Sequence, residues 1–353
     1  MEKTKKTSIS FAAMNTAEGF RGYFKEIFGD VAELYIIKGG PGTGKSRFMK
    51  EIGKLAEQNG RSVEYFLCSS DPASLDGVIF TDRDGNSVGI IDGTAPHAYE
   101  PTLAGVKEHI LNFGDFWDPA LLISHKTEIE ALAEAKKRLY RSFYSYLSAI
   151  RALDEITSSL SHLAIDGEKL SDSVRRFSVA VREGNGYSEK IRIRSAVSCD
   201  GFITLDEYGK SAKVKYAVTD SFLTAGIFMT ELKKELKERN VAVKISYSPF
   251  SPTIPDAIYI PAADTAFYIG CSCDEGEKTV NMRRFIISEK LAPYKTKLRE
   301  IAKLRKELMR LLNGDAMSIR SLHEAMETLY GEAMDFTRKE ALTRRLSKKF
   351  FDF

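Results

Sequence analysis

The sequence has no long hydrophobic run, since no apolar stretch approaches the roughly 20 residues that a membrane-spanning helix requires. Its N-terminal residues, MEKTKKTSIS, carry charge but contain no apolar core of the kind found in a secretory signal. Long linkers and low-complexity segments are missing as well. With 43% hydrophobic residues in a chain of 353, these absences predict a cytoplasmic protein of two domains with no membrane span.

Cysteine is scarce, and neither sign of charge dominates. Only Cys271 and Cys273 are close together among the four cysteines, and C-x-C matches neither a disulfide framework nor a zinc-binding spacing, so we expect reduced structural thiols. Lys and Arg (52) nearly balance Asp and Glu (49). The resulting formal charge of +3 is too small to indicate a nucleic-acid-binding surface.

One motif is present in full. Residues 34–46 read LYIIKGGPGTGKS, an apolar run followed by the pattern G-x-x-x-x-G-K-[ST]. Glycines let such a loop turn successive backbone N–H groups around phosphates, while the lysine neutralises phosphate charge and the serine hydroxyl ligates Mg²⁺. The motif therefore predicts binding of a nucleoside triphosphate with Mg²⁺. The predicted nucleotide-binding residues are Gly39, Gly40, Pro41, Gly42, Thr43, Gly44, Lys45, Ser46 and Arg47.

The residues around this motif have the pattern that a nucleotide-binding loop needs. Residues 34–37 read as a buried strand, and apolar residues recur at helical spacing from Phe48 until Asn59 and Gly60 end the helix. The positive N-terminal end of that helix is predicted to point at the bound phosphates.

Acidic residues follow two further predicted strands. Residues 87–91 end in Asp92, which is predicted to face Mg²⁺, although an Asp before a glycine also commonly forms a turn. Asp71, after the strand at 63–68, is a candidate base or water-orienting group, whereas Asp76 reads as a turn or helix cap. His97 is a candidate contact for nucleotide or substrate. The predicted catalytic residues are Lys45, Asp92 and Asp71, and the predicted metal ligands are Ser46 and Asp92.

The two halves of the chain match each other, which indicates an internal duplication. Phe48, Met49, Glu51 and Lys54 correspond to Phe228, Met229, Glu231 and Lys234, and Asn112, Phe116, Lys126 and Thr127 correspond to Asn281, Phe285, Lys295 and Thr296. The second copy of the loop, at 219–226, has Ala225 in place of the lysine and also contains Asp220 and Phe222. The second half is therefore predicted to be non-catalytic.

The order of elements predicts the α/β class, with duplicated P-loop NTPase-type three-layer α/β/α cores, each carrying an appended helical hairpin. The first half spans 1–186 with its helical appendage at 127–182. The second half spans 187–353 with its appendage at 288–350. Charged runs within the appendages read as solvated helix faces, and partner or membrane binding is the less favoured alternative.

Three segments, GGPGTGKS, DPASLDG and DGTAPH, together resemble those of a family of bacterial tandem P-loop ATPase-like proteins of poorly defined function, along the full length of the chain. The resemblance implies nucleotide binding and identifies no substrate. Members of that family usually keep a P-loop in each half, and the sequence departs from them at 219–226.

The leading hypothesis is an enzyme that hydrolyses ATP with Mg²⁺ at a single N-terminal site. ATP is preferred to GTP because no guanine-reading N-K-x-D motif is present. A small-molecule kinase would use the same phosphate cradle, and a nucleotide-dependent binding or regulatory module would bind ATP with little turnover. These alternatives imply an unidentified small-molecule or protein partner.

Overall fold

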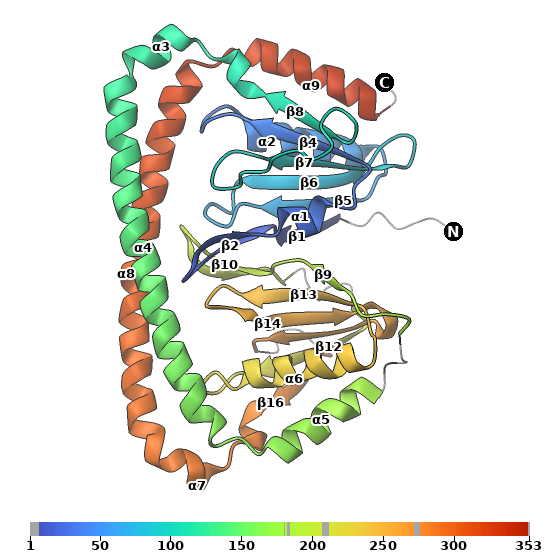
Figure 1. Ribbon diagram of the computed structural model, residues 1–353, viewed down its shortest axis with the longest axis vertical. Helices are drawn as coiled ribbons and strands as arrows, with labels where there is room; N and C mark the ends of the chain where they lie inside the picture. The colour runs from blue at the N-terminus through green and yellow to red at the C-terminus, as the bar shows by residue number, and fades with distance from the viewer. Residues whose placement is uncertain (1–6, 180, 182–183, 207–211, 272–275, 352–353) are drawn as a thin grey trace.

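The computed structural model describes residues 7–179, 181, 184–206, 212–271 and 276–351. Two β-sheets lie one above the other along the long axis, and two long helices run along one side of both (Figure 1). The mixed α/β class predicted from the sequence is confirmed. Within the described ranges, no helix combines the length and the apolar character needed to cross a membrane.

The first sheet has six strands, and the strand beside one edge, β4, leads into the glycine-rich loop. In spatial order the strands are β1 (Thr7–Phe11), β5 (Val63–Leu67), β6 (Leu75–Thr81), β7 (Ser87–Asp92), β4 (Glu33–Lys38) and β8 (Glu108–Asn112). All neighbours are parallel except that β6 runs antiparallel to both β5 and β7. Leu34 and Ile36 of β4 face one core and Tyr35 and Ile37 face the other, so both faces of this strand are buried.

Helices cover both faces of the first sheet. On one face, Phe28 of α1 (Phe24–Phe28) packs among the buried apolar residues. On the other face lie α2 (Lys45–Gln58), through Phe48 and Ile52, and α9 (Phe336–Phe350), through Leu346 and Phe350. α9 comes from the opposite end of the sequence, so the core of the first sheet is completed by the second half of the chain.

The second sheet repeats the strand order of the first. Its strands are β9 (Glu189–Ile191), β13 (Val243–Ser248), β14 (Ser251–Ile260), β15 (Thr265–Ile269), β12 (Val214–Thr219) and β16 (Lys278–Asn281). The antiparallel strand is again the third, β14. α6 (Ala225–Glu238) follows β12 as α2 follows β4, and α5 (Gly167–Val179) packs against α6.

Small hairpins join the two sheets. They are β2 (Ala13–Thr16) with β3 (Gly19–Gly22), and β10 (Ser195–Ser198) with β11 (Gly201–Thr204). Phe11 and Ile193 exchange two backbone hydrogen bonds, of 2.8 and 3.3 Å, between the halves. Short helices occupy the connections: η1 (Phe113–Phe116), α3 (Pro119–Ser124), η3 (Pro261–Ala263), η4 (Met282–Phe285), α7 (Ser288–Leu291) and η5 (Ala292–Tyr294).

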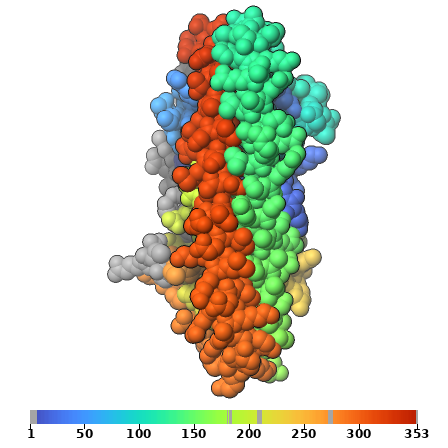
Figure 2. Space-filling view, turned by 90° about the vertical axis from the view of Figure 1, so that its left-hand side faces the viewer, coloured from blue at the N-terminus to red at the C-terminus, as the bar shows by residue number. Residues whose placement is uncertain are grey.

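The two long helices, α4 (Lys126–His162) and α8 (Lys295–Glu332), run antiparallel and lie side by side over the length of the molecule (Figures 1 and 2). Their shared core contains Phe143, Leu147 and Ile150 of α4 with Leu312, Ala316 and Ile319 of α8. At about 1.5 Å per residue, helices of 37 and 38 residues are long enough to reach past both sheets.

The helical hairpin that the sequence predicts within each half, at 127–182 and 288–350, does not form. α4 pairs with α8, α5 packs against α6 of the second half, and α9 packs against α2 of the first half. The length of α4 and α8 is the physical reason, because each helix carries the chain past its own sheet and delivers the next helix to the other one.

Candidate functional site

The loop of residues 39–46 connects β4 to α2 in a conformation that depends on glycine. Gly42 and Gly44 have φ angles of +69° and +77°, in the left-handed region that other residues rarely adopt. The Thr43 hydroxyl donates a hydrogen bond of 2.9 Å to the Gly40 carbonyl and braces the turn. Together with the free amides at the start of α2, such a loop is typical of phosphate-binding sites.

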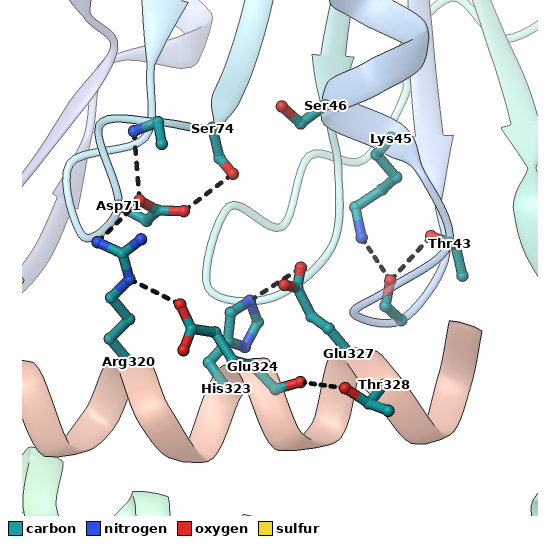
Figure 3. Close-up of polar contacts among 12 residues, drawn as sticks. Thr43, Lys45, Ser46, Asp71, Ser74, Arg320, His323, Glu324, Glu327 and Thr328 are labelled. Atoms are coloured by element: carbon teal, nitrogen blue, oxygen red, sulfur yellow. Dashed lines mark hydrogen bonds and ion pairs between the residues drawn. The ribbon is translucent and has the colours of Figure 1, made fainter. Parts of the chain in front are cut away.

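Lys45 lies within this loop and is 11% exposed. Its Nζ donates a hydrogen bond of 2.6 Å to the Gly40 carbonyl, which also accepts from Thr43 (Figure 3). It donates a second, of 2.8 Å, to the Gly39 carbonyl and lies 3.6 Å from Asp92 Oδ2. The Thr94 hydroxyl donates to the same Gly39 carbonyl at 2.8 Å. The fold therefore brings the predicted lysine and the predicted acid together at the loop.

The two predicted metal ligands can both offer oxygen atoms. Ser46 Oγ accepts a hydrogen bond from the Leu75 amide (2.9 Å), and Asp92 Oδ1 accepts one from the Thr94 amide (2.9 Å). Each side chain keeps further lone pairs, and oxygen is the ligand that Mg²⁺ prefers. The Arg47 side chain is 75% exposed, so we assign its contribution to the backbone amide at the start of α2.

Asp71 lies on the wall of the site with its carboxylate already engaged. Oδ1 accepts from the Ala73 amide (3.2 Å) and Oδ2 from the Ser74 hydroxyl (3.0 Å), which makes an Asx turn. Arg320 of α8 lies 3.9 Å from Oδ1 (Figure 3). These contacts hold the carboxylate in one orientation beside the cavity described below.

Asp76 is neither a turn residue nor a helix cap, so that expectation is wrong. It lies within β6, is 3% exposed, and its Oδ2 is 3.2 Å from His97 Nε2. The His97 ring packs against Phe20 and Phe24, with centroids 4.9 and 5.5 Å away. Burial lowers the pKa of His97, but the Asp76 carboxylate more than offsets this, so the net pKa is raised.

The same pair lies close to a thiol. Cys68, Asp76 and His97 each offer one potential metal-ligating atom, and these atoms lie within 4.8 Å of one another. Burial raises the pKa of the Cys68 thiol well above its usual range, and Asp76 adds to this effect. Because thiolate and neutral imidazole are the ligating forms, both shifts oppose metal binding. We assign Asp76 and His97 to an ion pair.

We expect His97→Gln to lose stability in a pH-dependent way. The pKa of His97 is raised in the folded protein, so its contribution to stability is complete below the unfolded value of about 6.5 and disappears as pH rises through the folded pKa. Urea unfolding of wild type and variant at a series of pH values measures the difference. If the difference in unfolding free energy between wild type and variant did not become smaller toward alkaline pH, the ion pair would be contradicted.

α8 of the second half covers the mouth of the loop and supplies side chains that no sequence motif marks. Arg320, His323 and Glu327, at helical spacing, face the first core (Figure 3). A Cβ on Gly42 would lie 2.2 Å from the Glu327 carbonyl oxygen, so only glycine allows this approach. Lys136 of α4 lies 2.9 Å from His323 Nδ1. Burial, followed by the charge of Lys136, lowers the pKa of His323 to about 4, which keeps the ring neutral.

The carboxyl group of Glu327 lies against the glycine-rich loop. Burial raises its pKa, and a hydrogen bond with the Gly42 backbone only partly offsets this rise. His323 Nε2 lies 3.6 Å from Oε1 of the same residue (Figure 3). A phosphate in the loop would therefore have to compete with a protein carboxylate.

We expect Glu327→Gln to bind MgATP about tenfold more tightly than wild type, because the variant removes a negative charge beside the phosphate position. Equilibrium titration with a fluorescent ATP analogue measures the change. Glu332→Gln, on an exposed part of the same helix, is the matched control. Weaker binding by Glu327→Gln would show that the carboxylate assists the nucleotide.

A cavity of about 420 Å³ extends from the loop between the first core, the two long helices and β10. Its walls are partly apolar, with Tyr140, Phe143, Val197 and Ile319, and partly polar, with Asn15 and Ser70. Asp92, Asp71 and His97 also line it, so all three predicted residues face one space. The side chains contributed by α4, α8 and β10 were not foreseen because their positions depend on how the halves pack.

The corresponding loop of the second half is bonded to its own carboxylate. The Asp220 carboxylate accepts a hydrogen bond of 3.0 Å from the amide of Ala225, the first residue of α6. Phe222 and Leu223 have φ angles of +57° and +62° at positions that in the first loop belong to Gly42 and its neighbour. A protein carboxylate thus accepts from the first amide of α6, and Ala225 stands where the first loop has Lys45.

Comparison of the chain with protein-family models, with curated proteins and with solved structures finds no match. The function is therefore inferred from the geometry of the site.

Proposed function

We propose that the chain binds ATP with Mg²⁺ at residues 39–47 and hydrolyses it at this single site. One observation carries the proposal: a loop with two left-handed glycines holds Lys45 3.6 Å from Asp92 at the N-terminal end of α2. An amide cradle, a buried cation and a metal-ligating acid at one point are what triphosphate binding requires.

Each residue has a role that follows from its position. MgATP supplies a phosphoanhydride bond whose terminal phosphorus is activated by the metal. Lys45 stabilises charge on the phosphate oxygens as that bond breaks, and Ser46 and Asp92 hold the metal. Asp71, fixed by its own turn and by Arg320, orients the attacking water. We also propose a cytoplasmic location, where ATP is available to the chain.

The second half has a supporting role in this proposal. Its sheet has the strand order of the first, which supports an internal duplication of two P-loop-type cores and agrees with the resemblance to tandem P-loop ATPase-like proteins. Asp220 occupies the anion position there, so we assign no turnover to it. The second half instead closes the first site with α8.

A second candidate, a small-molecule phosphotransferase, is favoured by the cavity of about 420 Å³ next to the loop. Hydrolysis needs space for one water only, whereas this space has apolar walls and several polar groups, as sites for small molecules commonly do. An acceptor hydroxyl near Asp71 would take the place of water.

Release of phosphate and ADP from ATP, with Mg²⁺ and with EDTA, tests the two candidates together. Mg²⁺-dependent ADP and phosphate in equal amounts support the hydrolase. ADP formed only when a pool of small metabolites is added, without free phosphate, supports the phosphotransferase. Absence of nucleotide binding in an equilibrium titration would exclude both.

A further inference from the structure

The nucleotide site has a second wall that comes from α9, the helix that the second half contributes to the first core. A Cβ on Gly44 would lie 3.5 Å from Lys339 Cδ, 3.6 Å from Phe336 Cε1 and 3.7 Å from Lys339 Nζ. Gly44 is the residue directly before α2, so both side chains of α9 border the end of α2 that carries the free amides.

Lys339 has an unusual environment for a lysine. It is 2% exposed, and among the residues that the structure describes its ammonium group makes no hydrogen bond and no ion pair. Burial lowers its pKa, the Glu51 carboxylate opposes this shift, and the neighbouring Arg47 adds to it. An ammonium group without a counter-ion beside the positive end of a helix is unfavourable by itself, and an anion bound there would remove the cost.

Phe336 complements this cation with an aromatic surface. The ring is 42% exposed although it lies beside the loop. The start of α9 is anchored to the first core, since the Asp335 amide donates to the Phe116 carbonyl (2.8 Å) and Arg338 donates to the Asp115 carbonyl (2.9 Å). The helix turn that carries the ring and the ammonium is therefore fixed before any ligand binds.

The direction of a bound triphosphate follows from the other residues. Its terminal phosphate belongs beside Lys45 and Asp92, which line the cavity together with residues of α8. The α-phosphate and the nucleoside then lie beside the amides at the start of α2. Lys339 and Phe336 border this end of the loop.

We propose that α9 completes the nucleotide site, with Lys339 pairing with the α-phosphate and the Phe336 ring packing against the base. The inference rests on the proposed function and extends it, since both residues belong to the half that has lost its own loop. The second half would then be required for binding as well as for closure of the site.

Equilibrium binding of MgATP, MgADP and Mg-tripolyphosphate to the full chain tests this assignment. We expect Phe336→Ala to weaken ATP and ADP binding about tenfold while leaving tripolyphosphate, which has no base, unchanged. We expect Lys339→Met to weaken all three about tenfold or more, and Lys339→Arg to restore much of the loss. Lys348→Met, exposed on the same helix, is the matched control.

The outcomes separate this inference from the function on which it rests. Wild-type protein that binds no nucleotide removes the proposed function. If wild type binds ATP and both Phe336→Ala and Lys339→Met bind it equally well, only the role of α9 is excluded. Thermal unfolding of every variant accompanies the titrations. Phe336→Ala truncates a half-exposed ring, so it gives a decisive result even if Lys339→Met is unstable.

Discussion

Replacement of Lys45 by alanine is expected to abolish turnover of ATP and to weaken MgATP binding severely. The ammonium lies inside the loop, 2.8 and 2.6 Å from the carbonyls of Gly39 and Gly40, so it is held where phosphate charge would be stabilised. Removing one such preorganised donor typically costs at least about 100-fold in rate. Single-turnover and steady-state phosphate release, together with equilibrium titration of MgATP, measure the effect.

A matched control for this variant lies on the same helix. Lys54→Ala removes an exposed lysine of α2 and should bind and turn over ATP like wild type. Thermal unfolding of Lys45→Ala should remain close to that of wild type, because Asp92 keeps its hydrogen bond from the Thr94 amide. If Lys45→Ala retained wild-type turnover, the loop of residues 39–46 would not be the active site.

The second large effect is expected in the pairing of the long helices. Arg305 of α8 makes two hydrogen bonds to Asp154 of α4, of 2.6 and 3.1 Å, and Asp154 is only 5% exposed. Arg305→Met would leave the carboxylate buried without its cation, at a cost of about 3 kcal/mol in the free energy of unfolding. Urea unfolding followed by circular dichroism measures this loss.

A double variant separates the contribution of the ion pair to stability from that of side-chain packing. Asp154→Leu with Arg305→Met replaces both charges by apolar groups and should recover most of the stability. The defect of the single variant should also shrink as pH falls. Burial already raises the pKa of Asp154, and without Arg305 the folded state would bind the proton more readily still. A defect that stays constant with pH would assign the cost to lost packing of Arg305 over the Phe250 ring, 4.8 Å away.

Local elements of the first core could be predicted because short-range chemistry determines them. The apolar run at 34–37 belongs to β4, and the helix predicted after the glycine loop is α2, which ends at Gln58, next to the expected Asn59. Asp92 is the last residue of β7 and reaches the loop because parallel neighbouring strands end at the same edge of a sheet. The apolar strand pattern and the glycines were sufficient to predict the positions of these residues.

Asp76 shows where such reasoning fails. Its counterpart Asp256 in the second half suggested a structural turn or helix cap, whereas Asp76 lies in β6 and is buried against His97. The same is true of its counterpart Asp256, which is buried in β14 and accepts a hydrogen bond from Ser195. A buried carboxylate can be recognised only when its partner is known, and the partner comes from another part of the chain.

The sequence by itself determined the glycine-rich loop with Lys45, the place of Asp92 at the end of a strand, the matched positions of the two halves and the replacement of the lysine by Ala225. These features depend on residue types within a few positions of one another. Only the tertiary structure decided that α8 covers the loop, that Glu327 hydrogen-bonds the Gly42 backbone and that α9 borders the loop with Lys339. Helical periodicity shows which residues share a face, but what that face contacts is set by the packing of α4 and α8 and the exchange of their terminal helices.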